Sequence, residues 1–241
     1  MNLAQLILEK ILVVFFKLFF SVRGRADNTP LLEKTALLYK GSGFTEIFTH
    51  IRLWDSPIPE IEKLVPHEGV IIDLGCGDGL LTNYLALSSP KRKVYGIELN
   101  QKRIKQADKG LKNTKFIAAD ITEKQIPKAD TILLVHVLHH LTSLKDQEAL
   151  LQTCYENLSP KGELVISEIN TRPLVKYWFT WITDTIIVPI LFENRLFNGA
   201  IFFRSTNQWK NLLKSIGFKC RSYEAHKDKP FSHSIIICQK I

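Results

Sequence analysis

Short apolar runs rich in β-branched residues recur through the middle of the chain, and segments with helical periodicity separate them. The runs lie at residues 70–74, 94–98, 116–118, 131–135 and 164–167. Continuous rather than alternating apolar residues are typical of strands that are buried on both faces. Because strands that alternate with helices form a parallel sheet through βαβ crossovers, this pattern predicts a doubly wound α/β domain.

The last part of the chain adds one helix and two further strands to this pattern. Residues 207–216 have the periodicity of a helix that ends at Gly217, and residues 218–223 and 234–239 are strand-like. Since a short connection joins these two runs, we expect them to be antiparallel neighbours at one edge of the sheet. The complete prediction is a mostly parallel sheet of seven strands with an antiparallel last strand.

The first residues are much more apolar than a terminus that faces solvent. Residues 1–25 contain an unbroken apolar run at positions 11–16, but Lys10 and Lys17 interrupt the roughly 20 apolar residues that a membrane span requires. A cleavable signal peptide carries its basic residues before the apolar part, whereas here Arg23 and Arg25 follow it. We therefore predict a helix that lies in the membrane interface; the alternative is a helix packed on the protein's own core or on a second subunit.

Two further segments flank or interrupt the predicted sheet. Residues 26–66 contain breaks at prolines and glycines, which predict short helices wrapped around the main domain. Residues 170–205 are unusually rich in tryptophan, phenylalanine and isoleucine for a connection, which predicts an apolar helical lid over a substrate pocket. The main domain is then expected to span residues 67–241, with the lid as an insertion.

The charge and the cysteines narrow the range of partners. The chain of 241 residues has a formal net charge of +8 and a pI near 9.3, which favour an anionic environment such as an acidic membrane or nucleic acid. The basic residues are scattered and no nucleic-acid-binding module is visible, so nucleic acid is not an expected partner. Cys76, Cys154, Cys220 and Cys238 lack any CxxC pair, so their spacing predicts neither a zinc site nor a small disulfide scaffold. A reducing cytosol is the expected compartment.

A cluster of glycines follows the first predicted strand, in the stretch VIIDLGCGDGLL. Ligands of open α/β sheets bind beyond the carboxyl ends of the strands, and glycines let the backbone approach them closely. A dinucleotide site needs the spacing G-x-G-x-x-G, but Leu80 stands at the position of the third glycine. Asp73 and Asp78 flank the loop, and carboxylates repel a pyrophosphate. They suit a ligand that carries an ammonium group, a sulfonium and ribose hydroxyls.

Two more carboxylates follow the next two predicted strands. Glu98 ends the run at 94–98, and a carboxylate there can accept two hydrogen bonds from vicinal ribose hydroxyls, as in NAD sites and other nucleoside sites. Asp120 follows the run at 116–118 and supplies an acceptor where an adenine amino group is expected. The three strand ends together therefore predict a nucleoside site.

The motifs around these residues resemble a known family. IIDLGCGDG, YGIELN, FIAADI, ADTILLVHVLHHL and LSPKGELVISE are similar, in this order, to the successive motifs of class I S-adenosylmethionine-dependent methyltransferases. The match covers about residues 67–168, and RSTNQWKNLLKSIGF resembles the family's late helix before strand six. The resemblance implies a Rossmann-like fold and S-adenosylmethionine as cofactor, but it implies no particular acceptor.

The resemblance also implies roles for individual residues. Asp73 and the glycine loop are expected to face the methionine half of the cofactor, Glu98 its ribose, and Asp120 its adenine. The implied cofactor-binding residues are Asp73, Gly75, Cys76, Gly77, Gly79, Glu98, Leu99, Asp120, Ile121 and His136.

The segment HVLHHL supplies the candidate catalytic residue. His136 stands at the end of the fourth predicted strand, where an imidazole with an ordinary pKa near ~6.5 can take a proton from a hydroxyl, phenol or carboxylic acid. The alternative is a residue that lines the cofactor through its backbone. His139 and His140 are expected to have a structural role at the start of a helix, and the spacing of the three histidines predicts no metal site.

These features together predict a methyltransferase that works near a membrane. The apolar segments 1–25 and 174–203, with the excess of basic residues, indicate peripheral contact at the cytoplasmic face of a bilayer. The expected acceptor is an apolar or amphiphilic small molecule, such as a lipid, fatty acid, quinone or polyprenyl-linked intermediate. The alternatives are a soluble small-molecule methyltransferase, an RNA methyltransferase and a non-catalytic protein that binds S-adenosylmethionine; a nucleotide-binding oxidoreductase conflicts with Leu80.

Overall fold

The computed structural model describes residues 29–123, 126–182, 185, 201–225 and 231–240. The predicted interfacial helix at residues 1–25 and residues 186–200 of the predicted lid lie outside these ranges. The helices are α2 (Pro30–Leu37), α3 (Phe44–Asp55), α4 (Ile58–Glu62), α5 (Leu80–Ser88), α6 (Gln101–Ala107), the 3-10 helix η1 (Leu138–His140), α7 (Leu144–Asn157), α8 (Leu174–Ile182) and α9 (Thr206–Ile216). The strands are β1 (Gly69–Leu74), β2 (Arg92–Glu98), β3 (Thr114–Ala118), β4 (Ala129–Val135), β5 (Leu158–Ile169), β6 (Phe218–Glu224) and β7 (His233–Lys240).

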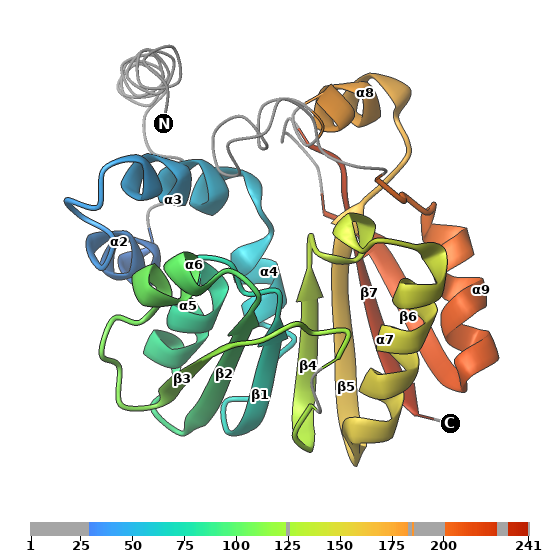
Figure 1. Ribbon diagram of the computed structural model, residues 1–241, viewed down its shortest axis with the longest axis horizontal. Helices are drawn as coiled ribbons and strands as arrows, with labels where there is room; N and C mark the ends of the chain where they lie inside the picture. Colours follow the sequence, from blue (N-terminus) through green and yellow to red (C-terminus); the bar gives the residue numbers. More distant parts are fainter. Residues whose placement is uncertain (1–28, 124–125, 183–184, 186–200, 226–230, 241) are drawn as a thin grey trace.

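The strands form one sheet of seven in the order β3-β2-β1-β4-β5-β7-β6 (Figure 1). Strands β1 to β5 are parallel, whereas β7 pairs antiparallel with both β5 and β6. The predicted α/β sheet with an antiparallel last strand is therefore confirmed. The strand order reverses between β1 and β4, and the carboxyl ends of these two strands mark the expected place for a ligand.

The continuous apolar runs are explained by helices on both faces of the sheet. Ile72, Leu134 and Ile166 pack in one buried cluster with residues of α7 and α9. The neighbouring residues Leu133 and Val165 point to the opposite face and pack in a second cluster with residues of α2, α4 and α5. Since successive side chains of a strand alternate between faces, both must be apolar when both faces are covered.

A buried arginine joins the helices before β1 to the sheet. Arg92 is fully buried at the start of β2, and its guanidinium donates to the backbone oxygens of Val65 and Pro66 at 2.7 Å each. It also forms an ion pair of 3.0 Å with Glu62 of α4 and a hydrogen bond to Ser88. These contacts satisfy the charge away from water and fix the end of α4 against the edge of the sheet.

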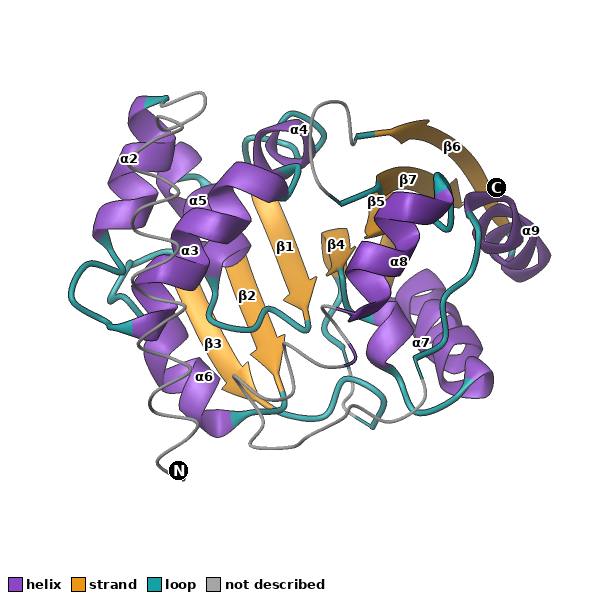
Figure 2. Cartoon of the chain, turned by 90° about the horizontal axis from the view of Figure 1, so that it is seen from above, coloured by secondary structure: helices purple, strands orange, loops and turns teal. Residues whose placement is uncertain are grey.

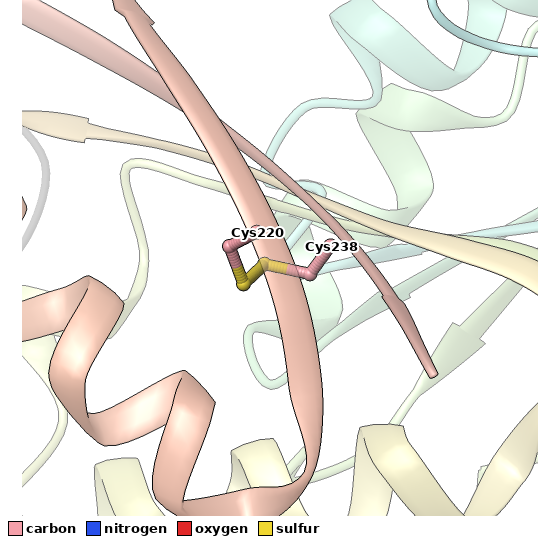
Figure 3. The surroundings of a disulfide bond; sticks show 2 residues. All are labelled: Cys220 and Cys238. Carbon is pink, nitrogen blue, oxygen red and sulfur yellow. A yellow bond between two sulfur atoms is a disulfide. The ribbon is translucent and has the colours of Figure 1, made fainter. Parts of the chain in front are cut away.

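A disulfide bond links Cys220 of β6 to Cys238 of β7 (Figure 3). The two residues face each other in the antiparallel register, with their Cα atoms 4.2 Å apart. The cysteine spacing did not predict this bond, because the two residues are 18 positions apart in sequence and become neighbours only through strand pairing. Cys76 and Cys154 are free thiols.

Two helices lie beyond the carboxyl ends of the parallel strands. Figures 1 and 2 show α3 on the side of β1 to β3 and α8 on the side of β5 and β7. Within the described part of the chain, no helix combines the length and the apolar character that crossing a bilayer demands. The two helices α3 and α8 thus lie at the end of the sheet where the parallel strands terminate.

Candidate active site

The glycine loop after β1 has a left-handed backbone that only glycine adopts easily. Gly75, Gly77 and Gly79 have φ angles of 71°, 56° and 73°. The backbone N–H groups of Gly75 and Cys76 donate to the carbonyl of Ile97, at 2.8 and 3.1 Å, which ties the loop to the end of β2. A Cβ on Gly79 would lie 2.7 Å from the Cβ of Ala107, so the close packing of the loop also requires glycine.

Side chains of Tyr39 and Arg103 hold the rest of the loop in place. Tyr39 is fully buried, and its hydroxyl donates to the backbone oxygen of Asp78 at 2.8 Å and accepts from Asn83 at 2.9 Å. The Asp78 carboxylate forms an ion pair with Arg103 of α6 at 3.2 Å. Asp78 therefore stabilises the loop, and this arginine partner was missed by the sequence prediction.

Glu98 brings its carboxylate over the same loop. Its Oε2 accepts from the N–H of Gly77 at 3.1 Å, and its Oε1 accepts from the N–H of Asn100 at 2.9 Å. The next residue, Leu99, is 67% exposed although it is apolar. A carboxylate and an open apolar side chain thus lie side by side at the tip of β2, and this pair fits the hydroxyl edge and the flat face of a nucleoside.

Asp120 and Ile121 follow β3. The Oδ1 atom of Asp120 accepts from the backbone N–H and the hydroxyl of Thr122, at 2.8 and 2.7 Å, which orients the carboxylate. Ile121 is buried and belongs to the core cluster of α7 and α9. The structure places both residues at the third strand end, beside the end of β2 that carries Glu98.

Asp73 is a buried carboxyl group at the carboxyl end of β1. It is 2% exposed and accepts a hydrogen bond of 2.6 Å from Thr82 of α5. Burial raises its pKa to about 7, although the Thr82 hydroxyl and the positive charge of Arg52 lower it. Burial disfavours the ionised form of this group, and a positive charge brought close to it would favour that form.

The raised pKa of Asp73 predicts that cofactor affinity rises with pH. The positive charge of the ligand favours the ionised form, which accounts for about a tenth of the molecules at pH 6 and about nine tenths at pH 8 when the pKa is about 7. Calorimetry should therefore show S-adenosylmethionine binding about 10-fold tighter at pH 8 than at pH 6. Asp73→Asn should bind weakly at both pH values, and a wild-type affinity independent of pH would contradict the prediction.

The same shift has the opposite effect on the stability of the ligand-free protein. A carboxyl group whose pKa is higher in the folded than in the unfolded state holds an extra proton when folded, so stability falls as pH rises from about 4 to about 7. Asp73→Asn removes this penalty. The variant is therefore expected to gain stability over the wild type at pH 8, measured by urea unfolding.

His136 occupies the turn that follows β4. It has a left-handed φ of 55°, rare for a residue with a side chain, and its N–H donates to Ser167 of β5 at 2.9 Å. Burial, and then the positive charge of Arg52, lower its pKa well below the ordinary value of a histidine. The imidazole is therefore neutral at physiological pH, as a proton acceptor must be.

The sequence prediction missed two residues that are linked to His136, one directly and one through the other. Its Nε2 lies 2.9 Å from Nδ1 of His233, the first residue of β7, and the rings stack with centroids 4.8 Å apart. The Nε2 atom of His233 in turn lies 3.0 Å from Oδ2 of Asp55, the last residue of α3. Sequence pattern gave no signal for this contact, because the three residues come from distant parts of the chain.

A buried carboxylate fixes the turn that carries His136. Glu168 accepts from the N–H groups of Val137 and Leu138, at 3.1 and 2.8 Å, and its other oxygen lies 2.5 Å from Nδ1 of His139. The contact ties His139 to β5, and its predicted structural role stays a prediction. Among the described residues, no group of histidine, cysteine and acidic side chains is arranged to hold a metal ion.

Three further residues are structural or lie near the site. Trp209 is buried in the core, and Arg204 lies over its ring while donating to Gln147 of α7 at 2.8 Å. Arg52 of α3 is close enough to lower the pKa of both Asp73 and His136, so it faces the site. The helices before β1 thus contribute charge to the site.

The fold and the strand-end site together define a class I S-adenosylmethionine-dependent methyltransferase. A family model described as a methyltransferase domain matches residues 48–223. The chain belongs to this family of methyltransferases. The matched residues run from α3 to β6.

The individual relatives have low sequence identity to this chain. The chain is 26% identical over 172 residues to (S)-coclaurine N-methyltransferase of Thalictrum flavum subsp. glaucum, covering 59% of this chain and 47% of the relative. It is 30% identical over 181 residues to the mitochondrial ubiquinone biosynthesis O-methyltransferase of Bos taurus, covering 67% and 44%. The crystal structure of human N-acetylserotonin methyltransferase in complex with S-adenosylmethionine has 19% identity and a TM-score of 0.60, covering 84% of this chain and 57% of that one. The chain spans about half the length of the curated relatives it matches.

Proposed function

We propose that this protein binds S-adenosylmethionine across the ends of β1, β2 and β3 and transfers its methyl group to a small acceptor. The observation that carries the proposal is the position of Glu98, whose carboxylate reaches Gly77 of the glycine loop at 3.1 Å and so joins two parts of a nucleoside site. Asp73 and the loop Gly75, Cys76, Gly77 and Gly79 face the methionine half. Glu98 and Leu99 hold the ribose, and Asp120 with Ile121 meets the adenine.

The bound cofactor supplies a methyl group on a positively charged sulfur, so the protein has little covalent chemistry to perform. Its residues orient donor and acceptor in line, which contributes up to roughly 7–11 kcal/mol in the best oriented cases. Asp73 supplies a compensating negative charge next to the cation. His136, neutral and placed at the end of β4, is the base that faces the acceptor.

The acceptor is proposed to be apolar or amphiphilic. Helix α8 leaves Leu174, Val175 and Trp178 exposed at 60%, 82% and 56%. Aromatic contacts link α8 to His139. The ring centroids of Tyr177 and Phe203 lie 5.5 Å apart, and Phe203 stacks on His139 with the ring centroids 4.9 Å apart. Such surroundings favour a lipid, fatty acid, quinone or polyprenyl-linked intermediate over a strongly polar molecule.

Transfer of labelled methyl groups tests the proposed reaction. Purified protein with labelled S-adenosylmethionine is expected to label components of a lipid extract and to label polar metabolites much less. The relatives include both an N- and an O-methyltransferase, so the kind of acceptor atom has to be determined. Mass spectrometry of the product serves this purpose. Tight cofactor binding without any labelled product would contradict catalysis and favour a non-catalytic binder, whereas labelling of polar metabolites alone would favour a soluble small-molecule enzyme.

The exposed face of α8 further supports contact with an anionic membrane. The formal charge of +8 attracts acidic lipids, and an exposed tryptophan with aliphatic neighbours suits the interface. We expect the protein to pellet with vesicles of anionic phospholipid at low salt. Val175→Asp with Trp178→Asp should weaken this binding at least 10-fold, since charged residues are costly to insert.

Leu37→Asp is the matched control for the membrane experiment. Leu37 is 65% exposed on α2, so its replacement introduces one negative charge into a surface away from α8, and the single variant Val175→Asp is the protein with which it is compared. Equal loss of vesicle binding in both proteins would mean that net charge alone drives the association. Absence of binding by the wild type would remove the membrane from the proposal while leaving the reaction intact.

A further inference from the structure

Three buried or half-buried polar side chains form a continuous line of hydrogen bonds beside the candidate site. Asp55 ends α3, His233 begins β7, and His136 follows β4. The two contacts span 178 and 97 positions of sequence, and both are close to ideal length at 3.0 and 2.9 Å. Asp55 and His233 are 5% and 1% exposed, so the line is shielded from water.

The hydrogen-bond partners determine which ring nitrogen of each histidine carries a proton. A carboxylate only accepts hydrogen bonds, so Nε2 of His233 carries the proton that it donates to Asp55. Nδ1 of a neutral His233 then has a lone pair and accepts from Nε2 of His136. Nδ1 of His136 is left with a free lone pair, and none of the hydrogen bonds of the described residues uses this atom.

The surroundings also decide which histidine better carries a positive charge. Burial disfavours a positive charge on His136, and Arg52 and the neighbouring histidines, His233 included, act in the same direction. His233 has the Asp55 carboxylate at 3.0 Å. A proton passed on to His233 would place its positive charge next to this carboxylate.

We propose that Asp55 and His233 form a proton relay behind His136, and that the acceptor of this enzyme is a protonated hydroxyl, such as a phenol. This inference rests on the proposed methyl transfer. The acceptor oxygen loses its proton to Nδ1 of His136, whose Nε2 proton passes to Nδ1 of His233. The oxygen electron pair forms the bond to the methyl carbon while the carbon–sulfur bond breaks and leaves its electron pair on sulfur. The positive charge thus ends on His233, next to Asp55.

The relay is needed only when the acceptor still holds its proton, and this gives a specific test. The probes are a 4-alkylphenol, with a pKa of about 10, and its 2-nitro derivative, which is largely ionised at the assay pH of about 8.5. Asp55→Asn and His233→Gln are expected to lower kcat for the alkylphenol about 100-fold, within the usual range for acid–base catalysis. For the nitrophenol, kcat should fall less than about 3-fold. The affinity for S-adenosylmethionine should change little with either variant.

His67→Gln is the matched control, because His67 is exposed and outside the site. It should leave both reactions unchanged. Equal losses with the two phenols would mean that Asp55 and His233 act only on structure, and would overturn the relay. A wild-type protein that methylates amines or carbon acids but neither phenol would overturn the inference while the proposed methyl transfer stands. Failure to bind the cofactor would instead reject the proposed function itself.

A conservative variant and a spectroscopic measurement keep the test valid if another variant fails to fold. Asp55→Asn keeps the volume of the buried side chain and can still contact His233, so it separates charge from packing. In ¹⁵N spectra of the wild type, His136 should carry its proton on Nε2, and Asp55→Asn should shift the population toward the other tautomer. An unchanged His136 tautomer in a folded Asp55→Asn variant would contradict the inference.

Discussion

Glu98→Ala is expected to weaken the binding of S-adenosylmethionine about 100-fold. In the proposed site a ribose diol donates two hydrogen bonds to this carboxylate, and hydrogen bonds to charged groups contribute about 1.5–3 kcal/mol each. Part of this is offset because Glu98 already accepts from Gly77 and Asn100 at 3.1 and 2.9 Å. A net loss of about 2.7 kcal/mol corresponds to the stated factor, and titration calorimetry measures it directly.

Two further variants make the Glu98 experiment specific. Glu98→Gln keeps one acceptor oxygen and should lose about 10-fold in affinity, between the wild type and Glu98→Ala. Glu60→Ala removes an exposed carboxylate of α4 and should have no effect. Unchanged binding by Glu98→Ala would refute the ribose role and, with it, the placement of the nucleoside at the end of β2.

Gly79→Ala is expected to destabilise the protein by about 3 kcal/mol and to reduce cofactor binding sharply. The left-handed φ of 73° costs a residue with a Cβ about 1–2 kcal/mol. The new methyl group would lie 2.7 Å from Ala107 and 2.8 Å from Phe116, and such overpacking costs about 1–3 kcal/mol more. Relief of these contacts must displace the loop, so the variant should lose affinity as well as stability.

Gly110→Ala separates the two causes. Gly110 has a similar φ of 69°, but a Cβ there would meet no atom within 4 Å. It should therefore lose only about 1–2 kcal/mol in urea unfolding and keep its cofactor affinity. If both variants were equally destabilised, the close approach at Gly79 would have no energetic weight and the loop would be governed by backbone conformation alone.

The sheet and the cofactor side of the site could be predicted because they are written in local sequence. Apolar runs gave the strands, and the ends of three consecutive strands gave Asp73, Glu98 and Asp120. The partners of these residues were harder to find. Arg103 and Glu168 are ordinary charged residues in their own segments, and only the fold shows that they are bound to Asp78 and His139.

On the side proposed for the acceptor, the sequence analysis named only His136. The segment that contains Asp55 has the pattern of a surface helix. His233 begins a strand that pairs with β5, and this pairing brings it to the end of the sheet where the parallel strands terminate. Contacts across 178 positions leave no pattern in a single sequence. The Cys220–Cys238 bond was missed for the same reason, since it depends on the register of β6 and β7.

The insertion of β7 between β5 and β6 has a consequence for biosynthesis. The glycine loop, Glu98 and Asp120 emerge from the ribosome within one continuous stretch of chain, before α7 has been made. His233 belongs to the strand that is translated last of the seven, so its meeting with Asp55 must wait until β6 is already out. A nascent chain therefore releases the three strand ends proposed to bind the cofactor well before the strand that carries His233.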